Sequence, residues 1–329
     1  MNHRRRAWLH RTTVLGGGAM LAPWLLGCGA ESPLTVAYHP WPGYAPLKLA
    51  DSLGWWDDGR LRGLPTGSAS ASRVALAEGR AQAAALTLDE TLLAVADGLP
   101  LHVVALFNLS RGADVVLAKP GFTDRTRWVG ARLGHEKGAV GELMRASWLE
   151  YVGLRAEDVT VVHLAADEHP SAWKDGRVDL LVTFEPTASR LESLGAKRLF
   201  DSSQLPPDRP IADVLVIRAD AWRRRRAALR TLVRHIFAAQ RHLMALPVDA
   251  AYRLAPWLDV PHAAVMRTFS GLRLTNWADN REWLIGRPAP LQRAAEGLAS
   301  FMGRVNILRP LRLPEDLVVG SALPAEEPL

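Results

Sequence analysis

Residues 34–47 read LTVAYHPWPGYAPL and begin the part of the chain that we expect to fold. The run LTVAY at residues 34–38 favours β-structure, and the prolines and glycine of residues 39–44 are typical of a tight turn. Residues 46–53 then predict a helix that ends at Gly54. A strand that passes into a helix within a few residues predicts a βα unit, which is the building block of an α/β protein.

The same alternation continues through the middle of the chain. We expect strands at residues 81–86, 101–107, 115–118, 128–134, 159–164, 179–183 and 214–218, and helices at residues 70–79, 90–96, 139–152, 170–175 and 187–194. Short connections between them predict an α/β fold with largely parallel sheets. After residue 218 the pattern becomes helical, with helices expected at 229–244, 262–271 and 290–303 and a loose tail at 321–329.

Length and composition set limits on the fold. The chain has 329 residues, of which 48% are hydrophobic, and it has one cysteine. It is too long for a single small core and too apolar for general disorder, so we expect two lobes or domains. The single cysteine excludes a framework of internal disulfides and any zinc site built from several cysteines.

The N-terminus predicts an export signal. Four arginines within residues 4–11 precede an apolar stretch at residues 14–26, which is too short and too rich in glycine to be a convincing membrane span. The sequence RRAWL at residues 5–9 resembles a twin-arginine signal, although export by the Sec route remains an alternative. We therefore expect residues 1–27 to be a signal peptide.

The end of this signal explains where the cysteine lies. The sequence LLGC at residues 25–28 resembles the bacterial lipobox, in which cleavage precedes a cysteine that receives a lipid. We expect Cys28 to be lipidated, with residues 28–33 as a linker. This predicts a lipoprotein of the cell envelope, facing the periplasm, on either the inner or the outer membrane.

Several phrases together resemble the substrate-binding proteins of ABC importers, in the family that binds aliphatic sulfonates, taurine, nitrate or thiamine-pyrimidine precursors. These are YHPWPGYAPL (38–47), LGWW (53–56), GSAS (67–70), ALAEG (75–79), TLDE (87–90), SRGAD (110–114), FEP (184–186) and DVLV (213–216). The resemblance covers residues 34–220 well and the helical remainder loosely. It rests on the order of these phrases together with the lipoprotein signal, since each phrase alone is short.

This resemblance implies a two-lobed type II periplasmic binding fold with a ligand cleft between the lobes. Lobe I would contain residues 34–116 and 214–320, and lobe II residues 117–213. The chain would cross between lobes at 115–118 and 214–218, and these crossings would form a hinge. A monomer of this kind binds a small polar molecule such as a sulfonate, nitrate, an amine or a pyrimidine, without cofactor or reaction. Closure around the ligand would be sensed by a permease with its ATPase.

Each candidate ligand contact also has a structural alternative. Aromatic rings after the first strand could stack on a ligand or cover the lobe surface. Hydroxyls at helix starts could bind an anion or cap the helix, and carboxylates at strand ends could accept hydrogen bonds from a ligand or cap the next helix. The expected ligand-binding residues are Trp41, Tyr44, Ser70, Thr87, Asp89, Glu90, Ser110, Asp114, Gly138, Glu185 and Asp213. Asp213 has a second expected role in bracing the hinge.

Enzymatic and nucleic-acid functions have weak support. The histidines have no HExxH spacing, and the chain lacks GxSxG, GxGxxG and phosphate-binding loop motifs. An exported enzyme of the same fold acting on a pyrimidine-like precursor is one alternative, and a periplasmic ligand sensor is another. The arginine run at residues 223–226 is interpreted as the solvated first turn of a helix, because aromatic residues are not interleaved with it.

The net charge of +6 does not indicate a polyanionic partner. Without the four arginines of residues 1–27, the remainder carries +2, and residues 28–212, which build most of the cleft, are mildly acidic. Sulfonate or nitrate sites require a cation and hydroxyls, whereas amines and aminopyrimidines require Asp or Glu. Asp89, Asp114 and Glu185 therefore favour a ligand that donates hydrogen bonds.

Overall fold

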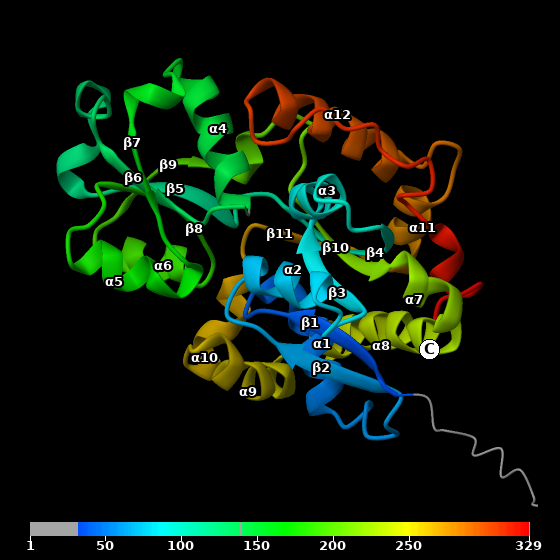
Figure 1. Cartoon of the computed structure of the whole chain (residues 1–329). Helices are drawn as coiled ribbons and strands as arrows, with labels where there is room; N and C mark the ends of the chain where they lie inside the picture. The colour runs from blue at the N-terminus through cyan, green and yellow to red at the C-terminus, as the bar shows by residue number, and fades with distance from the viewer. Residues whose placement is uncertain (1–31, 139, 329) are drawn as a thin grey trace, which may run out of the picture. The chain divides into compact units, whose positions relative to one another are not determined.

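A computed structural model describes residues 32–138 and 140–328 (Figure 1). The expected signal peptide, Cys28 and most of the expected linker lie outside these residues. The chain from Ser32 onward makes up one compact unit. Within the described ranges, no helix combines the length and the apolar character needed to cross a membrane.

A six-stranded sheet forms the core of lobe I. Its strand order is β11-β4-β10-β3-β1-β2. The bounds are β1 Leu34–Tyr38, β2 Leu61–Pro65, β3 Ala83–Thr87, β4 Leu101–Ser110, β10 Ala212–Arg218 and β11 Leu272–Leu274. The pairings make β1 to β4 run in one direction, while β10 and β11 run in the opposite direction.

A five-stranded sheet with the order β7-β6-β8-β5-β9 forms the core of lobe II. The bounds are β5 Asp114–Ala118, β6 Arg132–His135, β7 Thr160–His163, β8 Leu180–Phe184 and β9 Lys197–Asp201. Only β5 runs against the other four strands. Two mostly parallel sheets flanked by helices confirm the predicted fold class.

Helices cover both sheets (Figure 1). Those of lobe I are α1 Ala45–Ser52, α2 Ala69–Ala77, α3 Leu88–Ala96, α7 Ala219–Arg224, α8 Arg226–Ala245, α9 Pro247–Leu258, α10 His262–Val265, α11 Trp277–Leu284 and α12 Pro290–Arg304. Those of lobe II are α4 Val140–Val152, α5 His169–Lys174 and α6 Thr187–Ser193. The alternation of side chains along β5 explains the layering: Val116 packs in the core that includes α4, whereas Val115 and Leu117 pack with α5 and α6.

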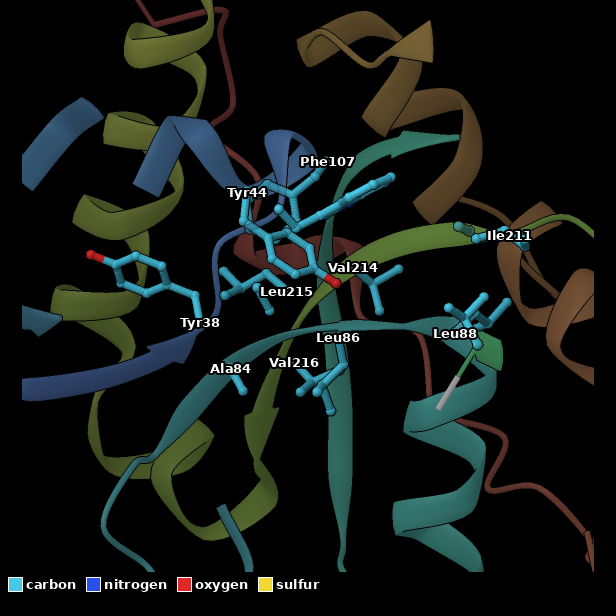
Figure 2. Packing of buried hydrophobic residues seen from close by; sticks show 14 of the residues in the cluster. Tyr38, Tyr44, Ala84, Leu86, Leu88, Phe107, Ile211, Val214, Leu215 and Val216 are labelled. Atoms are coloured by element: carbon cyan, nitrogen blue, oxygen red, sulfur yellow. The ribbon is translucent and has the colours of Figure 1, made fainter. Parts of the chain in front are cut away.

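The core of lobe I brings together side chains from strands distant in sequence. Tyr44 packs edge-to-face on Phe107 of β4, with ring centroids 5.6 Å apart. Figure 2 shows these two rings beside Val214 and Leu215 of β10, with Leu86 of β3 close by. Because β10 pairs with both β3 and β4, the chain that returns from lobe II becomes a central strand among the N-terminal strands of lobe I.

The crossings between the sheets lie a few residues from their expected positions. All of β5 pairs in the five-stranded sheet and all of β10 pairs in the six-stranded sheet. The chain therefore changes sheets at residues 111–113 and 202–211, between strands. At the first crossing, Gly271 packs so closely that an added Cβ would lie 2.6 Å from the backbone nitrogen of Ala113.

Some elements differ from their sequence-based predictions. The strand expected at 128–134 begins at Arg132, because Gly130 turns the chain with a φ of +81°. The arginine run at 223–226 was expected to begin a helix, but it spans the end of α7 and the start of α8. Part of the expected tail is packed: Ala322 is buried, and the Pro324 carbonyl accepts a hydrogen bond from Trp277 Nε1.

Candidate functional site

A cavity of about 20 Å³ lies between residues of the two lobes, which is room for about one water molecule. Lobe I contributes His39, Trp41, Tyr44, Ala69, Thr87, Glu90, Asp213 and, from the second crossing, Ile211. Lobe II contributes Asp114, Glu136, Val140, Gly141, His169, Val182, Thr183 and Phe184. The strand ends converge here, as expected for an α/β fold.

The loop after β1 places two aromatic side chains against one carboxylate. Trp41 Nε1 donates to Asp213 Oδ2 at 2.9 Å, and the Tyr44 hydroxyl donates to Asp213 Oδ1 at 2.8 Å. Gly43 permits this arrangement, because a Cβ there would lie 2.3 Å from Asn108 Nδ2 and 2.4 Å from Trp41 Nε1. Asp213 lies at the start of β10, so it fixes the aromatic loop to the strand that follows the second crossing.

Aromatic rings from both lobes meet at the cavity. Phe184, at the end of β8, packs edge-to-face with Trp41 at a centroid distance of 5.3 Å and with His39 at 6.4 Å. His39 in turn packs against Tyr44 at 5.2 Å. These rings supply flat apolar surfaces and exclude water from the polar groups beside them.

Carboxyl groups dominate the electrostatics of the cavity. Glu90, Asp114, Glu136 and Asp213 line it, and the described lining residues include no lysine or arginine. Burial raises the pKa of Asp114 to about 8, although a hydrogen bond from Ser110 opposes the shift, and the charges of nearby Asp213 and Asp89 add to the rise. Burial raises the pKa of Asp213 to about 6, although the hydrogen bonds from Trp41 and Tyr44 oppose the shift. A positive charge placed here would stabilise the ionised forms.

Burial also raises the pKa of Glu90 well above its usual value, with the charge of Asp89 as the second cause. Burial lowers the pKa values of His39 and His169 to about 4, so both imidazoles are neutral at pH 7. A neutral imidazole offers one donor and one acceptor.

Several buried polar atoms at the cavity have no hydrogen-bond partner among the described residues. They include Asp114 Oδ2, His39 Nδ1 and His169 Nε2. Because an unpaired buried polar atom costs about 1–3 kcal/mol, these atoms are suited to contact a bound molecule or water. In the described part of the chain, no group of three or more His, Cys, Asp or Glu side chains is arranged to hold a metal ion.

The cavity includes six of the eleven residues expected to bind ligand. They are Trp41, Tyr44, Thr87, Glu90, Asp114 and Asp213. Whether each contacts a ligand stays a prediction. Thr87 and Glu90 also form a capping box at the start of α3, so the structural alternative applies to them as well.

The other five expected residues lie outside the cavity lining. Ser110 pairs with the Ser202 hydroxyl at 2.7 Å, and Glu185 accepts two hydrogen bonds from Ser189, so both have structural partners. Asp89 is buried in the first turn of α3. The remaining two, Ser70 and Gly138, make contacts between α2 and the segment before α4.

Sequence reasoning missed several lining residues, chiefly His39, Glu136, His169, Thr183 and Phe184. Two of them had a usable signal. His39 directly follows the first strand, and Phe184 belongs to the phrase FEP, in which Glu185 was favoured instead. Phe184 faces the cavity because it ends β8, whereas the Glu185 carboxylate turns to the Ser189 backbone in α6.

Two sheets joined by two crossings, with a cavity between them, define the periplasmic binding protein fold, and solved structures match it. The alkanesulfonate-binding protein SsuA from Xanthomonas axonopodis pv. citri, solved with MOPS, has a TM-score of 0.71 and 18% identity, covering 88% of this chain and 96% of its own. A ligand-binding component of an ABC-type import system from Staphylococcus aureus, solved with zinc, has a TM-score of 0.72 and 14% identity, covering 89% and 98%. The nitrate-binding protein NrtA from Synechocystis PCC 6803 has a TM-score of 0.65 and 14% identity, and the match covers 90% of this chain and 92% of NrtA.

The chain belongs to the NMT1-like family, whose model matches residues 29–258. That range contains both sheets apart from β11, together with every cavity-lining residue. The comparison with curated proteins finds no match. The family and the solved structures agree on the fold that the resemblance in sequence implied.

Proposed function

We propose that this protein is the lipid-anchored substrate-binding component of an ABC importer, binding a small amine or pyrimidine-like molecule in the periplasm. The acidic cavity carries this proposal. Closure of the lobes would bury the ligand in the cavity that Trp41 and Phe184 line, and a permease with its ATPase would recognise the closed form. The protein acts as a monomer and carries out no reaction.

The charge of the cavity favours a ligand with positive charge or several N–H donors. Asp114 and Glu136 are carboxylates in a site whose described lining has no cationic side chain. A buried oxyanion would meet no cationic side chain there, whereas an ammonium or amidine group would stabilise the ionised carboxyl groups and gain charge-assisted hydrogen bonds. Sulfonate and nitrate, named for SsuA and NrtA, are therefore disfavoured for this chain.

A ligand screen by thermal unfolding tests the proposal. Residues 32–329 would be melted with alkylamines, aminopyrimidines, alkanesulfonates and nitrate. A ligand present at 100 times its dissociation constant stabilises the folded state by about 2.7 kcal/mol, which gives a measurable rise in Tm. We expect amines or aminopyrimidines to raise the Tm and the two anion classes to leave it unchanged. The opposite order of response would reject the proposed ligand class.

Membrane attachment is a separate expectation. Replacing Cys28 with Ser in the full chain should move the protein from the membrane fraction to the soluble periplasmic fraction, because the thiol is the atom that the lipid modifies. Fractionation with immunoblotting measures this, and incorporation of a labelled fatty acid should be lost in parallel. Continued membrane attachment of the Cys28→Ser protein would contradict lipid anchoring at this residue.

A further inference from the structure

Two helices that face each other across the cavity each bind a carboxylate from the opposite lobe. In lobe I, the backbone N–H of Ser70 in the first turn of α2 donates to Glu136 Oε1 of lobe II at 3.3 Å. In lobe II, the N–H of Val140, where α4 begins, donates to Glu90 Oε1 of lobe I at 3.3 Å. The two contacts are reciprocal.

Further contacts join the same segments. The Ser70 hydroxyl donates to the Lys137 carbonyl at 3.1 Å, and Arg73 Nη1 donates to the Gly138 carbonyl at 2.5 Å. Glu136, Lys137, Gly138 and Val140 of lobe II are thus held against α2 and α3 of lobe I. The side chain of Arg73 is itself oriented by an ion pair with Asp97 at 3.1 Å.

The chemistry of these contacts is that of an anion at a helix N-terminus. Backbone N–H groups and the helix dipole at this end favour negative charge. Glu136 supplies a carboxylate to α2, and Glu90 supplies an acceptor oxygen to α4. Glu90 also accepts the Thr87 N–H at 2.9 Å through its other oxygen, so its carboxylate joins the starts of α3 and α4.

We propose that Glu136 and Glu90 form a reciprocal latch that holds the lobes closed and occupies the helix N-termini where an oxyanionic ligand would bind. The latch rests on the proposed function, and it adds a reason for the class of ligand that the cavity binds. It explains physically why the cavity suits a ligand with donors: the protein's own carboxylates already satisfy the groups that would attract an anion. The Ser70 hydroxyl contributes to the latch by donating to the Lys137 carbonyl, so it is engaged between the lobes and does not line the cavity.

The test measures lobe closure without any ligand. Spin labels on cysteines introduced at the exposed positions Leu194 of lobe II and Val248 of lobe I would report the distance between the lobes by pulsed electron paramagnetic resonance, with residues 32–329 as the labelled protein. Glu136→Ala should lower the ratio of closed to open molecules about 10-fold, because a charge-assisted contact across the cleft is lost. Glu136→Gln, which keeps an acceptor oxygen, should have a smaller effect.

A control variant and a second cross-lobe variant complete the test. Glu157→Gln changes an exposed carboxylate that pairs with Arg155 within lobe II, so it should leave the distances unchanged. Arg73→Ala removes another of the cross-lobe contacts and should also favour the open form, which carries the test if Glu136→Ala fails to fold. Unchanged distances in folded Glu136→Ala and Arg73→Ala would overturn the latch.

Ligand-binding measurements distinguish failure of the latch from failure of the proposed function. Calorimetry with methanesulfonate should detect binding to Glu136→Ala but not to the parent protein, because the Ser70 N–H becomes available. Methanesulfonate binding to the parent would overturn the exclusion of oxyanions. Failure of all amines and pyrimidines to raise the Tm would reject the proposed ligand class, while the ligand-free distances would still report on the latch.

Discussion

Replacing Asp114 with Asn is expected to stabilise the ligand-free protein and to abolish ligand binding. Asp114 is 3% exposed, and its Oδ2 has no hydrogen-bond partner among the described residues. A buried carboxyl group of this kind lowers the free energy of unfolding of the ligand-free protein, and it provides a strong binding site for a positively charged ligand. Asn has nearly the same shape and removes the charge, so stability and binding should change in opposite directions.

The pH dependence follows from the direction of the pKa shift. Burial raises the pKa of Asp114 from 3.8 to about 8. Between these values the folded protein retains a proton that the unfolded chain releases, so the free energy of unfolding falls as the pH rises. One pKa unit corresponds to about 1.4 kcal/mol, which makes the stabilisation by Asp114→Asn on the order of 3–5 kcal/mol at pH 8 and much smaller at pH 4.

Denaturant unfolding at several pH values between 4 and 8, on the parent and on Asp114→Asn, measures this effect. The slope of the unfolding free energy against pH should be less negative in the variant. Asp124→Asn is a suitable control, because Asp124 is exposed and the pKa of its carboxyl is lowered by hydrogen bonds from Thr126. A variant at Asp114 that is less stable than the parent at pH 8 would show that burial of this carboxyl group does not destabilise the fold.

Local patterns predicted the βα units of this fold because each unit is determined by neighbouring residues. Leu34–Tyr38 was predicted with its exact bounds, and α4 was predicted to within one residue, because apolar periodicity and flanking glycines are local signals. The strands β2 and β9 were missed, since each has exposed polar positions and lies at the edge of a sheet. Their strand state depends on pairing with a neighbour that the local sequence does not reveal.

The site was only partly predictable for a similar reason. Asp213 and Asp114 lie in one cavity because both crossings are next to it. The resemblance to a two-lobed family predicted that the crossings adjoin a cleft. Glu136 had no comparable signal, because its role depends on the start of α2 in the other lobe. Glu185 had the right position in the sequence, but Ser189, four residues later, binds its carboxylate.

Replacing Asp213 with Ala should cause a large loss of both stability and ligand binding. The Asp213 carboxylate accepts from the indole of Trp41 and the hydroxyl of Tyr44, and all three side chains are buried. Each buried donor left without an acceptor costs about 1–3 kcal/mol, which gives a loss on the order of 2–6 kcal/mol in the free energy of unfolding. Binding should also fail, because Trp41 and Tyr44 line the cavity.

A thermodynamic cycle with Tyr44→Phe distinguishes this cause from a simple loss of packing. In the parent protein, Tyr44→Phe removes a bond to a carboxylate and should destabilise the fold by about 1.5–3 kcal/mol. In the Asp213→Ala protein, the same change removes a donor that has lost its acceptor, so it should be neutral or stabilising. Urea unfolding of the four proteins measures the coupling. If Tyr44→Phe destabilised both backgrounds equally, the Asp213 carboxylate would not be the group that holds the aromatic loop to β10.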